Sequence, residues 1–358
     1  MLSIDLILLT WNHLEITQRC LESLFSYVDI PSRLVIVDNG SDQPGVREYL
    51  QTVTAKGKIQ EVIVLQNEED FGFSKGMNRG LQFCLANNPK DYFCLVSNDV
   101  VATQGWLSEL VRIAQAQPDI GFVNPNSTNF GFYPPGRDKK EKKKAINEYG
   151  MRISQSSKGK WQELGSCVGF CFLVKKEVLD KIGLFDEVYG MAYYEDADLS
   201  KRAQSAGYLC ALAEASYVYH EQGSSFGKRQ EKSPLFLKNE EIFYSRWKMQ
   251  RPGRICYIID QPVNRTSNRL QEKLRRTANE FNKVWILCRD KDYAEVIPNH
   301  WNIQKVFLLG SALFFSWRAW LYLVFKKKKF DLLFVDNPDL IEFLRKTQNR
   351  YQTEFYPI

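Results

Sequence analysis

Short apolar runs alternate with amphipathic segments along the chain up to about residue 100. Each apolar run predicts a buried strand, and each segment with apolar residues three or four positions apart predicts a helix. The predicted strands are residues 4–10, 34–37, 62–65 and 92–96, and the predicted helices are 13–27, a segment from about 44, and 74–86. This regular alternation indicates an α/β fold with a doubly wound, mostly parallel sheet.

The pattern is lost between residues 121 and 161, where Asn, Pro, Gly and Lys dominate. Such a composition predicts a long surface loop or flap. Beyond it we expect a strand at 168–174, a short helix near 176–182, a helix over 199–206 and a short strand at 217–219.

After residues 251–253 the alternation of strands and helices starts again. The expected strands are 254–260, 283–287 and 330–336, and the expected helices are 267–280 and 339–346. We therefore predict two domains, residues 1–250 and a smaller, partial Rossmann-like α/β unit over residues 254–358.

Residues 312–325 are strongly apolar, and a run of lysines at 326–329 follows them. The segment contains Arg318 and is shorter than the ~20 residues that span a bilayer. We expect it either to lie at a membrane surface or to form a helix buried against a sheet.

The bulk composition is that of a soluble globular protein, with 44% hydrophobic and 25% charged residues among 358. The net charge of +6 lies mainly in the runs 137–144 and 326–329. Because the chain has no basic helix face and no recognisable nucleic-acid module, nucleic acid is not an expected partner. The chain has no GxxxxGK[ST] loop, which disfavours phosphotransfer on nucleotides.

The eight cysteines form no CxxC pair, and most of them lie inside apolar runs. This usage suits a reducing cytosol. The first residues lack the basic region and cleavage site of a signal peptide. A cytoplasmic location is therefore expected, with the inner face of the membrane as an option.

Three polar residues stand at or just beyond the ends of predicted strands: Thr10, Asp38 and Asp99. Ligands of doubly wound sheets bind beyond the carboxyl ends of the strands, so these residues are expected to share one cleft. Asp99 is a candidate oxygen ligand for a divalent metal ion. Asp38 has an alternative role as a turn aspartate, because turn-forming residues follow it.

An acidic pair, Glu195 and Asp196, stands just before a predicted helix. Such carboxylates stabilise the positive end of the helix dipole, or one of them accepts a proton in catalysis. His220 ends a short predicted strand, where it is either a surface residue or a metal ligand.

Six short motifs occur in order over residues 4 to about 225: 10–12, 37–41, 71–80, 97–99, 195–199 and 220–225. Together they resemble glycosyltransferase family 2, nucleotide-sugar enzymes with the GT-A fold, and especially its rhamnosyltransferase-like members. Residues 254–358 resemble, more weakly, the N-terminal half of a family 4, GT-B type glycosyltransferase. Such a half alone would be a non-catalytic remnant or a docking module.

The resemblance implies roles for individual residues. Asp196 is the implied catalytic base, and Glu195 orients that base or the acceptor. Asp99 and His220 are the implied ligands of Mn²⁺ or Mg²⁺, although Ser97 departs from the acidic residue usual in that motif. The implied nucleotide-sugar-binding residues are Thr10, Asn12, Asp38, Asn39, Asn78, Asn98 and Gly169.

The expected function is that of an inverting, divalent-metal-dependent glycosyltransferase. The donor is a nucleotide sugar, with UDP- and dTDP-sugars favoured, and the acceptor is a hydroxyl of a glycan or a lipid-linked molecule. The expected pathway is the synthesis of cell-surface polysaccharide, O-antigen or cell wall. Peripheral membrane contact is also expected, because a lipid-linked acceptor would account for the basic runs. The alternative is a catalytically degenerate protein that binds nucleotide sugars or carbohydrate.

Overall fold

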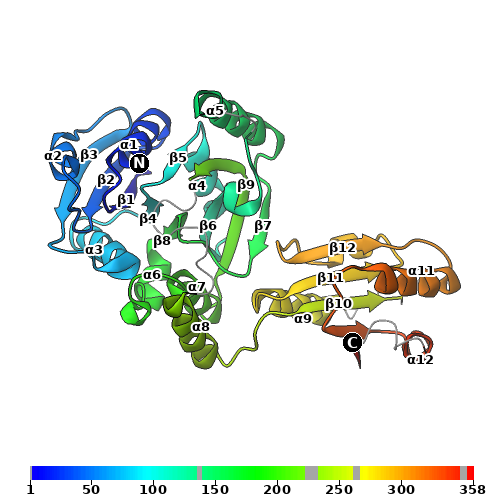
Figure 1. The fold of residues 1–358 in the computed structure, drawn as a ribbon. Helices are drawn as coiled ribbons and strands as arrows, with labels where there is room; N and C mark the ends of the chain where they lie inside the picture. The colour runs from blue at the N-terminus through cyan, green and yellow to red at the C-terminus, as the bar shows by residue number, and fades with distance from the viewer. Residues whose placement is uncertain (1, 135–138, 222–232, 261–266, 347–352) are drawn as a thin grey trace. The chain divides into compact units, whose positions relative to one another are not determined.

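The computed structural model of the protein describes residues 2–134, 139–221, 233–260, 267–346 and 353–358 (Figure 1). The chain divides into two compact units. Unit 1 contains Met1–Gln162 and Ser166–Trp247, and unit 2 contains Glu163–Gly165 and Lys248–Ile358. The family motifs quoted above all fall in the residue range of unit 1.

The first half of unit 1 is a parallel sheet with the strand order β3-β2-β1-β4. Its strands are β1 (Ile4–Thr10), β2 (Ser32–Asp38), β3 (Ile59–Gln66) and β4 (Tyr92–Ser97). The helices between them are α1 (Leu14–Tyr27), α2 (Val46–Thr52) and α3 (Gly72–Ala86). Each of these elements lies where the hydrophobic pattern predicts it, because a strand covered on both faces reads as a continuous apolar run.

The second half of unit 1 continues the same sheet in the order β4-β8-β6-β9-β5. Strand β8 runs antiparallel to both neighbours, β6 and β9 are parallel, and β5 is antiparallel to β9. The strands are β5 (Val100–Ala102), β6 (Ile120–Asn126), β8 (Cys171–Lys175) and β9 (Leu209–His220), with β7 (Trp161–Leu164), whose last two residues fall in unit 2. The helices are α4 (Trp106–Ala116), α5 (Lys139–Ser156), α6 (Lys176–Ile182), α7 (Glu195–Ser205) and α8 (Pro234–Trp247). The predicted α/β class with a large, mostly parallel sheet is confirmed.

The long loop predicted over residues 121–161 is wrong, because β6 and α5 occupy most of it. Strand β6 is buried along its whole length despite its polar composition. The Asn124 side chain explains this, since it donates hydrogen bonds to the carbonyl oxygens of Val168 and Cys171. In helix α5 the side chains of Ile146 and Ile153 are buried. The residues around them are mostly polar, so the sequence shows no clear helical period of apolar positions.

Two glycines of α3 serve close packing of this helix on β1. A Cβ atom at Gly76 would lie 2.6 Å from the Leu9 side chain, and one at Gly80 would lie 2.5 Å from Ile7. Both distances are shorter than van der Waals contact, so larger residues would push α3 off the sheet. These two glycines therefore approach the protein's own core rather than a ligand.

Unit 2 has a separate five-stranded sheet, entirely parallel, in the order β12-β11-β10-β13-β14. Its strands are β10 (Arg254–Ile259), β11 (Lys283–Cys288), β12 (Ile303–Phe307), β13 (Leu332–Val335) and β14 (Glu354–Pro357). Its helices are α9 (Ser267–Asn279), α10 (Tyr293–Val296), α11 (Ala312–Phe325) and α12 (Pro338–Arg345). Alternate residues of β10 join two hydrophobic clusters, one on each face of the sheet.

Within the described residues, no helix has both the length and the apolar character needed to cross a bilayer. All eight cysteines are buried, and none is joined in a disulfide. They pack as small apolar side chains, as their positions in the sequence predict.

Candidate active site

The carboxyl ends of β1 and β2 place Thr10 beside Asp38, because these residues are partners in the strand register. The Asp38 side chain is completely buried, and its Oδ1 accepts a hydrogen bond from the Ser41 N–H at 3.0 Å. Its Oδ2 lies 3.5 Å from the Arg47 guanidinium. Asp38 therefore stabilises the turn through Oδ1, and its Oδ2 is a buried carboxylate oxygen at the end of β2.

Asn98 lies in the turn between β4 and β5 and points back toward β1. Its Nδ2 donates hydrogen bonds to Thr10 Oγ1 at 3.2 Å and to Thr17 Oγ1 at 2.9 Å. The two hydroxyls are themselves 2.8 Å apart. This buried cluster fixes the turn that carries Asp99.

Asp99 and His220 meet because β5 pairs antiparallel with β9. Val100 is the register partner of His220, so the residue before β5 lies next to the end of β9. His220 Nε2 is 3.2 Å from Asp99 Oδ2. A backbone hydrogen bond joins the same two segments, because the Glu221 N–H donates to the Asp99 carbonyl oxygen at 3.0 Å.

The His220 ring is held in one orientation by two neighbours. Its Nδ1 is 2.6 Å from Asn129 Oδ1, and its face stacks on the Phe170 ring with centroids 4.9 Å apart. An amide oxygen only accepts hydrogen bonds, so Nδ1 donates in this contact, and Nε2 is the ring nitrogen that faces Asp99 Oδ2.

This donor set fits a divalent metal ion of the Mn²⁺ type. Carboxylate oxygen and imidazole nitrogen are both suitable ligands, and the imidazole favours Mn²⁺ over Mg²⁺. In the part of the chain that the structure describes, no group of three or more His, Cys, Asp or Glu side chains is arranged to hold a metal. Asp99 and His220 would therefore supply only part of a coordination shell, with phosphate oxygens and water as the remaining ligands.

The acidic pair lies in the first turn of α7, not before the helix as the sequence predicts. Asp196 accepts two backbone hydrogen bonds, at Oδ2 from the Gly169 N–H (2.9 Å) and at Oδ1 from the Ala197 N–H (2.7 Å). A Cβ atom at Gly169 would lie 3.3 Å from the Phe73 ring and 3.5 Å from Asp196 Oδ2. Gly169 thus contacts the acidic pair through its backbone.

The two carboxylates differ in their electrostatic environment. Burial, and then the charge of Asp196, raises the pKa of Glu195 to about 8. Burial also raises the pKa of Asp196, but the N–H groups of Gly169 and Ala197 oppose this shift by stabilising the anion. The pKa of both carboxyl groups is thus raised, and the two backbone N–H groups favour the negative charge on Asp196 over Glu195.

Residues 167–170, here called the linking segment, connect the two pairs of site residues. At one end, the Phe170 ring stacks on His220 and the Phe170 carbonyl oxygen accepts a hydrogen bond from the Ser97 N–H at 2.9 Å. At the other end, the Gly169 N–H binds Asp196, and the Cys167 N–H donates to Ser200 Oγ at 2.9 Å. Four consecutive residues therefore span the distance between the candidate metal ligands and the acidic pair.

Helix α8 supports the backbone that leads into the acidic pair. Tyr193 and Tyr194 both have left-handed backbone angles, with φ of 76° and 73°. Asn239 of α8 is buried, and its Nδ2 donates hydrogen bonds to the carbonyl oxygens of Tyr189 (2.6 Å), Ala192 (2.7 Å) and Tyr193 (3.2 Å). Residue 239 belongs to no recognisable motif, so no signal in the sequence predicts this support.

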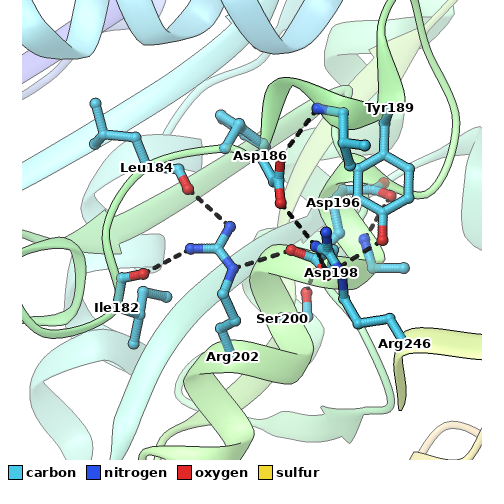
Figure 2. A network of polar contacts seen from close by, with 12 residues as sticks. Ile182, Leu184, Asp186, Tyr189, Asp196, Asp198, Ser200, Arg202 and Arg246 are labelled. Carbon is cyan, nitrogen blue, oxygen red and sulfur yellow. Dashed lines mark hydrogen bonds and ion pairs between the residues drawn. The ribbon is translucent and has the colours of Figure 1, made fainter. Parts of the chain in front are cut away.

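Asp198 is the centre of a buried polar network, shown in Figure 2. Its Oδ1 accepts hydrogen bonds from the Tyr189 hydroxyl, Arg246 Nη1 and Trp247 Nε1, and its Oδ2 accepts from Arg202 Nε. Arg246 belongs to α8 and also pairs with Asp186, so the network attaches α8 to α7 and to the preceding loop. The one sequence signal for this network is the four-residue spacing between Asp198 and Arg202, which brings the two side chains together on a helix.

Three further candidates, all asparagines, use their side-chain amides within the protein. Asn12 Oδ1 accepts two backbone N–H groups from the turn after β2. The Asn39 amide donates to Asp70, and the Asn78 amide exchanges hydrogen bonds with the backbone of Phe185. These contacts brace the loops at the carboxyl edge of the sheet, and none of the three side chains projects as an isolated polar group.

The fold and the site together define an α/β protein with a candidate metal site and an acidic pair at the carboxyl edge of a mostly parallel sheet. The sequence model described as Glycosyl transferase family 2 matches residues 5–183, which is half of the chain. The chain therefore belongs to glycosyl transferase family 2. This confirms the prediction that the chain contains a family 2 glycosyltransferase domain.

Two curated relatives are each 25% identical to the chain. The "Uncharacterized protein y4gI" of Sinorhizobium fredii aligns over 268 residues, which is 68% of this chain but only 27% of the relative. The "N-acetylglucosaminyl-diphospho-decaprenol L-rhamnosyltransferase" of Mycobacterium tuberculosis aligns over 237 residues, 60% of this chain and 74% of the relative. The chain thus spans about a quarter of the first relative's length.

Solved glycosyltransferase structures also show similarity. GalNAc-T7 with UDP, GalNAc and Mn²⁺ superposes with a TM-score of 0.49 and 14% identity, covering 69% of this chain and 49% of that one. TarS of S. aureus superposes with a TM-score of 0.46 and 14% identity, covering 68% and 39%.

Proposed function

We propose that this protein is an inverting, divalent-metal-dependent glycosyltransferase that moves a sugar from a nucleoside diphosphate to a hydroxyl of a glycan or lipid-linked acceptor. One observation carries the proposal: the linking segment joins a pair suited to a cation, Asp99 with His220, to a pair suited to proton removal, Glu195 with Asp196. A transfer reaction needs both functions within reach of one sugar.

Asp196 is the proposed general base. It removes the proton from the acceptor hydroxyl, whose oxygen attacks the anomeric carbon from the face opposite the diphosphate. The bond from that carbon to the diphosphate oxygen breaks, and the diphosphate leaves with the electron pair, so the configuration inverts. The two backbone N–H groups on Asp196 support this assignment, because they favour the negative charge on Asp196 while burial raises the pKa of Glu195.

Asp99 and His220 would hold Mn²⁺ or Mg²⁺. The ion supplies positive charge to the leaving diphosphate. Asn129 and Phe170 orient His220 so that Nε2 faces the same point as Asp99 Oδ2. The two protein ligands leave coordination positions for the donor.

We assign the donor to the carboxyl ends of β1 and β2, where Thr10 and the buried Asp38 would contact the base or the ribose. The family resemblance favours UDP- and dTDP-sugars. The name of the mycobacterial relative supports a rhamnosyl donor and a lipid-linked acceptor, and hence cell-surface glycan synthesis at the cytoplasmic face of a membrane. Unit 2 would then be a docking module.

The experiment measures release of nucleoside diphosphate from a panel of UDP-, dTDP- and GDP-sugars, with and without Mn²⁺ and with candidate acceptors. We expect metal-dependent release from one donor and its loss in the Asp99→Ala variant. Isothermal titration of the same donors separates binding from turnover. Metal-independent donor binding without turnover would instead favour the degenerate binding protein.

The base assignment has its own test. Asp196→Asn should lower turnover by ~10²–10⁴, the usual contribution of a general base. Donor affinity should be largely unchanged, because the Asp196 carboxylate contacts the backbone of Gly169 and Ala197 and not Thr10 or Asp38, which are assigned to the base and ribose. Asp180→Asn, at an exposed position on α6, is the control. Turnover within a factor of a few of wild type in Asp196→Asn would refute the assignment.

A further inference from the structure

Helix α11 of unit 2 carries large apolar side chains on its outward as well as its inward side, and Arg318 is its one charged residue. Phe315, Ala319 and Leu323 recur at intervals of four and face the unit 2 core, where they pack in the cluster that includes Leu333 and Val335. A surface helix of a globular protein normally shows polar residues opposite such a stripe. Here the opposite face is apolar as well.

The outward face carries large side chains. Phe314, Trp317 and Phe325 have exposed fractions of 62%, 52% and 77%. At 100° per residue these positions fall within an 80° arc, and the half-buried Leu321 lies between them. Single exposed apolar residues are normal on protein surfaces, but a contiguous aromatic stripe marks an interaction surface.

Positive charge adjoins this stripe. Arg318 is exposed on the same helix, and Lys327, Lys328 and Lys329 are exposed immediately after it. Lys329 Nζ donates to the carbonyl oxygen of Val324, so its charge is held at the end of the helix. The surface therefore combines an apolar stripe with a terminal basic cluster.

The dimensions exclude a membrane span by this helix. Fourteen residues extend about 21 Å at 1.5 Å per residue, whereas the hydrocarbon core of a bilayer is about 30 Å thick. A helix with an aromatic face and flanking lysines instead lies parallel to the interface, with its rings among the acyl chains and its lysines at the head groups.

We propose that the outward face of α11 (Phe314, Trp317, Leu321, Phe325), together with Arg318 and Lys327–329, docks onto an anionic lipid bilayer. Charge complementarity selects this occupant. A second copy of the chain would present the same basic cluster and repel it, while an anionic bilayer offers both hydrocarbon and negative charge. The proposal concerns where the protein works and does not depend on the reaction assigned to unit 1.

The test is co-flotation of the full chain with vesicles of phosphatidylcholine alone or mixed with phosphatidylglycerol. We expect binding to the anionic vesicles, weaker binding to the neutral ones, and a decrease with added salt. The triple variant Phe314→Ser/Trp317→Ser/Phe325→Ser should lose at least about tenfold in affinity, since each exposed ring loses its burial in lipid. Lys327→Gln/Lys328→Gln should lose affinity for anionic vesicles only, by roughly fivefold per lysine.

Matched controls are Phe343→Ser, an exposed aromatic on α12, and Lys283→Gln, an exposed lysine at the start of β11. Neither should change vesicle binding. Brominated lipid should quench tryptophan fluorescence of the wild type, and Trp317→Phe should keep binding while most of this quenching disappears. Circular dichroism confirms that each variant is folded.

Two results would overturn the proposal. One is vesicle binding that the triple variant and the lysine variant leave unchanged. The other is a dimer in sedimentation velocity that the triple variant dissociates, which would assign the stripe to a second copy of the chain.

Discussion

At the scale of single residues, the acidic pair shows how one helix turn places two adjacent carboxylates in different electrostatic environments. Glu195 is buried, with Oε2 accepting no hydrogen bond from the described residues, and its pKa rises to about 8. Asp196, one position further, accepts two backbone N–H groups. Neighbouring carboxylates in such different environments are typical of acid–base sites.

This difference predicts a pH-dependent stability. The folded protein keeps the Glu195 proton between its ordinary pKa of 4.5 and about 8, while the unfolded chain has lost it. The free energy of unfolding should therefore fall as pH rises through this range, by up to ~1.4 kcal/mol per pH unit from this group. Urea unfolding of wild type and Glu195→Gln at a series of pH values measures it.

The variant should lack that part of the slope, so the two curves should lie closest near pH 4.5 and diverge as pH rises to 8, with Glu195→Gln becoming the more stable protein. Glu241→Gln, at an exposed position on α8, should follow the wild-type curve. Parallel curves for wild type and Glu195→Gln would show that Glu195 titrates normally.

At the scale of elements, α8 holds the loop before α7 through Asn239, Arg246 and the ring of Tyr194, which lies 5.3 Å from the Phe236 ring. Left-handed backbone at two successive tyrosines costs of order 1–3 kcal/mol each and persists only where neighbours impose it. The support from α8 therefore sets the position of the tyrosines next to the acidic pair.

Asn239→Leu should lower the free energy of unfolding by about 2–4 kcal/mol, because three buried carbonyl groups lose a shared donor. It should also raise KM for the acceptor more than KM for the donor. Chemical unfolding and steady-state kinetics measure the two effects. Glu241→Leu, an exposed change on the same helix, should stay within about 0.5 kcal/mol of wild type. Equal changes in both KM values would contradict a local effect on the loop.

The sequence predicted helices and strands correctly where the apolar residues followed a single pattern. Strands such as β1 are buried on both faces, so they read as apolar runs, and α1 begins and ends within a residue of expectation. Strand β6 was missed because Asn124 is buried by pairing with backbone groups from another segment, which no local pattern reports. For the candidate site, the residues at the strand ends could be predicted from the sequence. Asn129, Phe170 and Asn239 could not, because they act through contacts with residues distant in sequence.

At the scale of the whole molecule, two sheets form two compact units, and the family match ends at residue 183, within unit 1. Both units bury their cysteines in apolar cores. Burial raises the pKa of Cys84 in unit 1 and of Cys288 in unit 2, each to about 12. Thiolates are the reactive species, so these thiols should be inert in the folded protein.

The prediction is a thiol count. Ellman's reagent should label almost none of the eight cysteines in the native protein within minutes and all of them after denaturation in guanidinium chloride. Thermal unfolding should be the same with and without reductant, because the structure contains no disulfide among its eight described cysteines. Rapid labelling of one native thiol would locate a segment that opens without global unfolding.

The linking segment has a consequence for the timing of the reaction. Phe170, which stacks on His220, is the chain neighbour of Gly169, whose N–H binds Asp196. Under the proposed function, a shift of Phe170 on donor binding beside His220 would be passed to the hydrogen bond on the proposed base. An enzyme built in this way would take its substrates in a fixed order, donor first.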